Sequence, residues 1–321
     1  MPLARRGTDA VLLLVALVWG SSYLVAKSAT DVLPVLAVLF ARYAVSALAC
    51  ALACGALVAA RRSGPGWTRA ELRAGGLLGV TQAAVLVLET YGVAHTSAAH
   101  AGLIISLTIV LTPLLDRTGG RPGLPPAFFG AAGLCVVAVG LLTAGAGLHA
   151  PRLGDALVLA AAVVRAGHVA LVGRLTAGRP MDPLHLTTVQ TAVGSVLFLP
   201  AAVVHVSALA HADAATWGQL VYLALFCSVF AFLAQTWAVQ RTSASRASLL
   251  LGTEPVWAVA AGIGLGGERL TLWASLGAVL MVAGTYWGQS VERATAPCRR
   301  SRFSPGRRRA RSASGRDRRP P

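Results

Sequence analysis

TYGVAHTSA at residues 90–98 recurs as TWAVQRTSA at residues 236–244, 146 positions further along the chain. The same offset aligns other residues in the same order: Asp9-Ala10 with Asp155-Ala156, and Pro34 with Pro180. The match continues at an offset of 144, where Gly140 aligns with Gly284, after a two-residue change in one loop. Chance matches between Ala-rich segments are the alternative explanation. Ordered matches at one spacing predict that the chain contains the same structural unit twice.

The composition indicates that both copies lie in a membrane. Hydrophobic residues make up 55% of the 321 residues and charged residues 12%, whereas a soluble domain carries about 25% charged residues. A helix needs about 20 apolar residues to cross a bilayer. The stretches of this kind are residues 8–27, 33–60, 74–94, 97–115, 126–145, 153–173, 184–206, 216–239, 244–265 and 270–290. We therefore expect an all-α integral membrane protein with ten transmembrane helices.

Five spans in each copy make the second copy enter the membrane from the opposite side, as in the inverted repeats of many transporters. We expect a first repeat over 1–146, a second over 147–291 and a tail over 292–321. With the N-terminus cytoplasmic, 12 loop arginines lie inside, against Lys27, Arg152 and Arg269 outside. Because basic loops stay cytoplasmic, both termini are expected inside the cell.

The net charge of +16 comes mainly from the tail, which holds 11 of the 28 Lys and Arg residues and only two acids. The membrane-embedded body is much less basic, so nucleic acid is not an expected partner. The tail has almost no apolar residues and is expected to be disordered. It either lies on anionic lipids of the inner leaflet or is simply solvated and helps to enforce the topology.

Four charged residues fall well inside the predicted spans. A charge near the bilayer centre costs at least about 2.5–3.5 kcal/mol, so each one needs a partner or a wet cavity. Judged by depth, Arg42 and Glu89 lie in the outer halves of their helices, whereas Arg165 and Glu254 lie near the middle. We therefore predict one ion pair between Arg42 and Glu89 and another between Arg165 and Glu254. The alternative is that such pairs only fix helix packing.

Helical spacing adds further candidates for a binding site. Trp19, Ser22 and Tyr23 share one face of the first span, and the repeat maps Trp19 to Arg165 and Ser22 to His168. In the third span Gln82 and Glu89 are seven residues apart, and the repeat maps Glu89 to Gln235. Faces that recur in both copies are expected to point inward. They contact either substrate or neighbouring helices, and packing is an equal alternative for the aromatic residues.

Pro255 interrupts the ninth span at GTEP (252–255), where it removes a backbone donor and frees the carbonyl of Leu251. An ordinary tolerated kink is the alternative to a binding role. Trp257 follows in the same segment and joins the candidate substrate-binding residues. If a proton is coupled to transport, Glu254 is the expected coupling residue, because its position at the midplane is the most desolvated.

Several segments resemble the EamA-type drug/metabolite transporter superfamily. The segments are VWGSSYLVAK at 18–27, AVLFARYAVSAL at 37–48, ETYGVAHTSAAHAGLIISLTIVLTPLL at 89–115 and LLLGTEPVWAVAAGIGLGGERLT at 249–271. The resemblance covers about residues 8–290. It implies a carrier, most often a bacterial exporter, with a cavity lined by helices 1–4 and 6–9 and with helices 5 and 10 used for packing. Glu89 and Arg165 depart from the usual neutral or apolar residues of such proteins.

We therefore predict a secondary active transporter that exports a small metabolite, an amino acid or a drug-like amphiphile by alternating access. Its expected location is a bacterial cytoplasmic membrane, with the lipid bilayer and protons as further partners. No cofactor is expected, because the sequence has no Walker motif, and Cys50 and Cys54 read as small buried hydrophobes. The alternative is a non-transporting membrane scaffold or an intramembrane enzyme. His95, Ser97 and His100 alone suggest an enzyme, and they lack an acidic partner at a suitable spacing.

Overall fold

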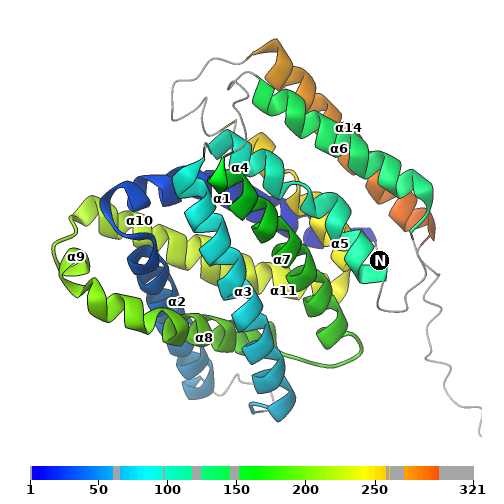
Figure 1. The fold of residues 1–321 in the computed structure, drawn as a ribbon. Coiled ribbons are helices and arrows are strands. Elements are labelled where there is room, and N and C mark those ends of the chain that lie inside the picture. The colour runs from blue at the N-terminus through cyan, green and yellow to red at the C-terminus, as the bar shows by residue number, and fades with distance from the viewer. Residues whose placement is uncertain are drawn as a thin grey trace, which may run out of the picture.

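The computed structural model describes residues 2–60, 66–96, 98–117, 124–144, 152–257, 260 and 271–295. Within these ranges the chain forms helices and no strand (Figure 1). Outside these ranges lie the tail beyond residue 295, Ser97, and residues 258–259 and 261–265 of the ninth predicted span. The helices of the first predicted repeat are α1 (Pro2–Val32), α2 (Val35–Ala59), α3 (Arg69–His95), α4 (Ala98–Ile105), α5 (Thr108–Arg117) and α6 (Pro126–Ala144).

The second predicted repeat begins with the long helices α7 (Leu153–Thr176) and α8 (Pro183–Val204). Its remaining helices are α9 (Val206–Ala210), α10 (Ala214–Ala224), the π-helical turn η1 (Leu225–Phe230), α11 (Ala231–Arg241), α12 (Ala244–Leu251) and α14 (Leu272–Thr295). Six of the described helices are long and apolar enough to cross a membrane: α1, α2, α3, α7, α8 and the continuous run Ala214–Arg241.

The fourth and ninth predicted spans are not continuous helices. The first break falls at Ser106–Leu107, between α4 and α5, and the second at Gly252–Thr253, after α12. In the second break the amide of Thr253 donates to Leu250 at 3.2 Å, which tightens the last turn, and helical backbone resumes at Glu254. The kink was predicted at Pro255, and the structure instead has a break that begins three residues earlier, at Gly252. The two breaks lie 146 residues apart, which is the offset between the two predicted repeats.

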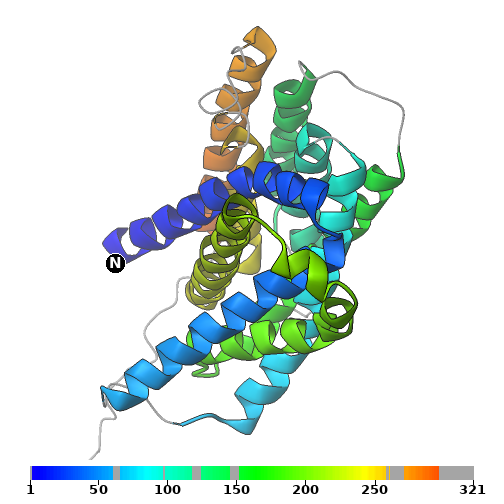
Figure 2. The same cartoon turned by 90° about the vertical axis from the view of Figure 1, so that its left-hand side faces the viewer.

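Helix pairs pack closely where glycine removes the side chain. Gly75 and Gly79 of α3 lie against α8: a Cβ on them would come within 2.7 Å of Val189 and 2.8 Å of Val193, respectively. The α6–α14 pair lies at one side of the molecule (Figures 1 and 2), where a Cβ on Gly284 would lie 2.7 Å from the sulfur of Cys135.

The outer surface of these helices is apolar. Leu52, Val203 and Val282 are 65%, 70% and 64% exposed, respectively. Soluble monomers rarely leave large contiguous apolar patches in water, whereas lipid requires such a surface. The exposed apolar side chains therefore agree with a multi-pass membrane protein.

Gly79→Val is expected to lower the melting temperature of the purified protein in detergent. The new side chain would overlap Val193 and the backbone of Gln190, and overpacking of this kind costs about 1–3 kcal/mol. Gly76→Val is the matched control, because a Cβ at Gly76 meets nothing within 4 Å. Equal melting temperatures for the two variants would contradict the close α3–α8 contact.

Candidate functional site

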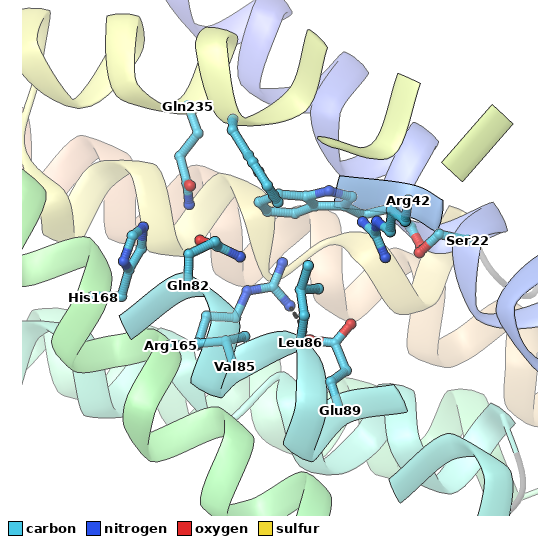
Figure 3. Close-up of a pocket in the computed structure, with 11 residues that line it drawn as sticks. Ser22, Arg42, Gln82, Val85, Leu86, Glu89, Arg165, His168 and Gln235 are labelled. Atoms are coloured by element: carbon cyan, nitrogen blue, oxygen red, sulfur yellow. Dashed lines mark hydrogen bonds and ion pairs between the residues drawn. The ribbon is translucent and has the colours of Figure 1, made fainter. Parts of the chain in front are cut away.

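A buried polar cavity lies between helices of both halves of the chain. Side chains from α1, α2, α3, α7 and α11 enclose it (Figure 3). The lining residues are Trp19, Ser22, Arg42, Gln82, Val85, Leu86, Glu89, Arg165, His168, Phe232 and Gln235. The space between them holds about one water molecule, so a larger ligand requires the helices to move apart.

Arg165 is the central charge of this cavity. Its guanidinium lies 4.2 Å from the centre of the Trp19 ring, which is the geometry of a cation–π contact. Its Nη2 donates to Oε1 of Glu254 at 2.8 Å, and its Nη1 lies 3.7 Å from Oε2 of Glu89. The predicted Arg165–Glu254 ion pair is thus present, and two acids share one cation.

Tyr23 holds Glu254 from the other side. The hydroxyl of Tyr23 donates to Oε2 of Glu254 at 3.0 Å, and both residues are buried, at 2% and 3% exposure. Glu254 and Tyr23 therefore do not line the cavity directly. They form a second layer that lies behind Arg165 and fixes its orientation.

The predicted pairing of Arg42 with Glu89 is wrong, because Glu89 lies beside Arg165. Arg42 instead contacts neutral groups on the π-helical turn. Its Nε donates to the hydroxyl of Ser228 at 2.6 Å, and its Nη2 donates to the carbonyl of Cys227 at 3.1 Å. In the described part of the chain, no carboxylate lies within 4.0 Å of the Arg42 guanidinium. Arg42 is thus a buried cation without an acidic partner.

The π-helical turn η1 supplies groups that the sequence analysis did not single out. The carbonyl of Cys227 accepts from Arg42 and also from the indole of Trp19, at 2.9 Å. A widened turn displaces carbonyls from the regular ladder, and π-helical turns are frequent at functional sites. Only the alignment of Ser228 with Gln82 in the repeat could have drawn attention to this segment.

His168 lies at the opposite end of the cavity in Figure 3, near Gln82 and Gln235. Its Nδ1 lies 2.8 Å from the hydroxyl of Thr81, and the same hydroxyl lies 3.0 Å from the carbonyl of Leu78. The Thr81 hydroxyl therefore links His168 of α7 to α3, either as the donor to Nδ1 or as the acceptor from it, according to the tautomer of the imidazole.

Eight of the eleven candidate residues line the cavity, and Tyr23 and Glu254 lie behind it. Trp257 does not line this cavity. It lines a separate apolar groove with Met281 and Tyr286 of α14. The apolar cavity residues Val85, Leu86 and Phe232 were not predicted, because nothing in the sequence separates them from the other apolar residues of their helices. The described residues contain no cluster of three potential metal ligands.

Polar contacts fasten both ends of α1. Near its N-terminus, Asp9 accepts two hydrogen bonds from Arg246, at 2.9 and 2.6 Å, and Arg246 also reaches Glu292 at 3.1 Å. Near its C-terminus, Lys27 donates to the carbonyl of Thr96 at 3.3 Å. Lys27 lies 18 positions after Asp9, which corresponds to about 27 Å of helix, close to the thickness of a hydrocarbon core.

Comparison with known proteins agrees with this architecture. A solved crystal structure superposes with a TM-score of 0.68 at 19% identity, covering 90% of this chain and 99% of the other. An uncharacterized transporter of Archaeoglobus fulgidus is 26% identical over 87% of this chain and 84% of its own length. A probable terminal-alkyne amino-acid exporter of Streptantibioticus cattleyicolor is 32% identical over 92% of this chain and 97% of its own length.

The profile of the EamA-like transporter family matches the chain twice, over residues 7–144 and 152–287. The two matches together span most of the described helices. The relatives are named as transporters and not as enzymes. The all-helical fold, the apolar outer surface and the double match lead to one conclusion: this protein belongs to the EamA-like transporter family.

Proposed function

We propose that this transporter is a secondary active exporter of a small metabolite in a bacterial cytoplasmic membrane, with both termini inside the cell. Transport proceeds by alternating access, in which one five-helix repeat moves against the other around the cavity. Protons are the proposed coupling ion, and Glu254 is the proposed coupling residue. The Arg-rich tail contacts anionic lipids of the inner leaflet.

The observation that carries this proposal is the buried charge at Arg42. If the buried charges served only to fix helix packing, each of them would be expected to have a partner of opposite charge. An unpaired charge in the membrane interior costs several kcal/mol. Arg42 is 6% exposed, and among the described residues its guanidinium donates only to a hydroxyl and a carbonyl. A buried cation without an acidic partner, facing a cavity, favours a site for an exchangeable ligand over a scaffold.

Two further features favour alternating access. The breaks at Ser106–Leu107 and Gly252–Thr253 lie at matching positions of the two copies, and broken helices near the midplane are typical of transporter binding sites. The contacts of Arg246 and Lys27 close the two ends of α1. Opening one end at a time requires only a few polar contacts to separate there.

The direction of transport and the substrate class rest on relatives. The Streptantibioticus protein is named as an amino-acid exporter, and it aligns over nearly the whole length of both chains. We therefore place amino acids first among the substrates, ahead of other metabolites and drug-like amphiphiles.

Purified protein in liposomes is expected to move at least one member of a panel of amino acids and small amphiphiles when a pH gradient is imposed. Liposomes without protein, and liposomes whose gradient has been collapsed with a protonophore, are the controls. A panel that gives no gradient-dependent flux would count against a secondary transporter. It would favour the scaffold or enzyme alternatives.

A further inference from the structure

We propose that the cavity binds the zwitterionic form of an apolar α-amino acid, with its carboxylate on Arg42 and its ammonium group on Glu89. This assignment rests on the proposed transport function and names the substrate class of the same site. It follows from two groups of opposite charge that face one cavity, lack full sets of partners and do not pair with each other.

Arg42 has donors left over on the side of the cavity. A guanidinium carries five N–H groups, and the described contacts of Arg42 use two of them: Nε to Ser228, and one N–H of Nη2 to Cys227. The two N–H groups of Nη1 and the second of Nη2 have no partner among the described residues. These two nitrogens form the fork that binds both oxygens of a carboxylate.

Glu89 has acceptors left over. Its nearest cation, Nη1 of Arg165, lies 3.7 Å away, which is too long for a hydrogen bond. The short bond of Arg165 goes to Glu254. No described group donates a hydrogen bond to Glu89, although its side chain is only 15% exposed. A protonated amine supplies several donors and a positive charge at this position.

The two groups are held apart by their surroundings. The π-helical turn anchors Arg42, and Glu89 lies in the field of Arg165. No ion pair joins Arg42 to Glu89, so their charged atoms are more than 4.0 Å apart. In Figure 3 both lie at the same end of the cavity, opposite His168.

The charge balance selects a zwitterion over an anion or a cation. Arg42, Arg165, Glu89 and Glu254 sum to zero when all are ionised. A ligand with one charge would leave the buried site with a net charge, whereas a zwitterion keeps it neutral and satisfies both groups at once. The uncharged lining consists of the apolar residues Val85, Leu86 and Phe232, with Trp19, Ser22, Gln82, His168 and Gln235. We assign the apolar residues to the side chain of the ligand, which is therefore apolar in this proposal.

The test uses three probes of similar size: L-leucine, L-leucinamide, which lacks the carboxylate, and 4-methylpentanoate, which lacks the amine. Binding to the full-length protein in lipid nanodiscs is measured by isothermal titration calorimetry. Loss of one charge-assisted contact is expected to weaken binding about 10- to 100-fold. Leucine should therefore bind more tightly than either analogue. This comparison needs no variant, so a folding defect cannot obscure it.

Two variants assign the two ends of the ligand. Arg42→Gln should bind leucine no better than leucinamide, while it still prefers leucine to 4-methylpentanoate. Glu89→Gln should show the opposite pattern. Arg241→Gln removes a charge from an exposed arginine that stacks on Trp237 outside the cavity, and it should retain the discrimination of the wild type.

Wild-type protein that binds leucinamide or 4-methylpentanoate as tightly as leucine would overturn the zwitterion assignment. So would the absence of binding by every proteinogenic amino acid at millimolar concentration. Neither result depends on the liposome experiment, in which flux of a different metabolite would still support transport. Failure of this assignment and failure of the proposed function are therefore distinguishable.

Discussion

Glu254→Gln is expected to abolish flux driven by a pH gradient while the protein stays folded and binds substrate. Glu254 accepts from Tyr23 and from Arg165, and an amide of the same shape can keep a contact with each. The amide cannot take up a proton, so it cannot switch between paired and released states of Arg165. Proton-driven uptake and substrate exchange, measured in the same liposomes, separate the two effects. Exchange should persist when uptake is lost.

Two acid-to-amide substitutions serve as controls for Glu254→Gln. Asp213→Asn keeps the N-cap of α10, because either side chain can accept from the amide of Thr216, and its pH profile should match the wild type. Glu89→Gln should weaken substrate binding but leave the pH dependence of the remaining flux. If Glu254→Gln transports with an unchanged pH profile, the carboxylate is a packing element. Coupling by Glu254 would then be rejected.

Arg165→Met is expected to cause the largest loss of stability of any single substitution in the cavity. Methionine is similarly long but uncharged, so two buried carboxylates, Glu89 and Glu254, lose the cation that they share. Removing one partner of a buried ion pair costs about 3–5 kcal/mol. Thermal unfolding in detergent, followed by circular dichroism, should show a correspondingly lower melting temperature.

A triple variant separates the stranded charges from lost packing. Glu89→Gln and Glu254→Gln, added to Arg165→Met, remove both carboxylates and should restore most of the lost melting temperature. If the triple variant remains as unstable as Arg165→Met, the packing of the guanidinium on Trp19 is responsible instead. A single variant that unfolds at the wild-type temperature would show that both acids find other partners.

Much of the helical arrangement could be predicted from the sequence, because an apolar stretch of bilayer length has few other structures available to it. The break in the fourth span could not, whereas the interruption of the ninth span was predicted at GTEP (252–255), although its break lies at Gly252–Thr253 and not at Pro255. Ser106–Leu107 contains neither glycine nor proline, and hydropathy records composition and not the register of backbone hydrogen bonds. The π-helical turn at Leu225–Phe230 was missed for the same reason.

Helical direction brought most of the candidate residues to one cavity, whereas depth predicted one ion pair correctly, Arg165 with Glu254, and the other wrongly. Residues that share a helical face in both copies, such as Trp19 with Arg165 and Glu89 with Gln235, do line one cavity. The pairing of Arg42 with Glu89 failed because depth fixes only one coordinate of a side chain. It does not say which neighbouring helix a side chain faces, and Glu89 faces Arg165 of α7.

Trp19 and Arg165 occupy matching positions of the predicted inverted repeat, and in the structure the Arg165 guanidinium lies over the Trp19 ring. If a twofold axis relates the two predicted copies, this contact requires the axis to pass close to both residues. The backbone around the cavity can therefore approach twofold symmetry while the side chains do not. The indole of Trp19 matches the guanidinium of Arg165, the hydroxyl of Ser22 matches the imidazole of His168, and the carboxylate of Glu89 matches the amide of Gln235. A ligand in such a site would therefore meet different chemical groups at its two ends.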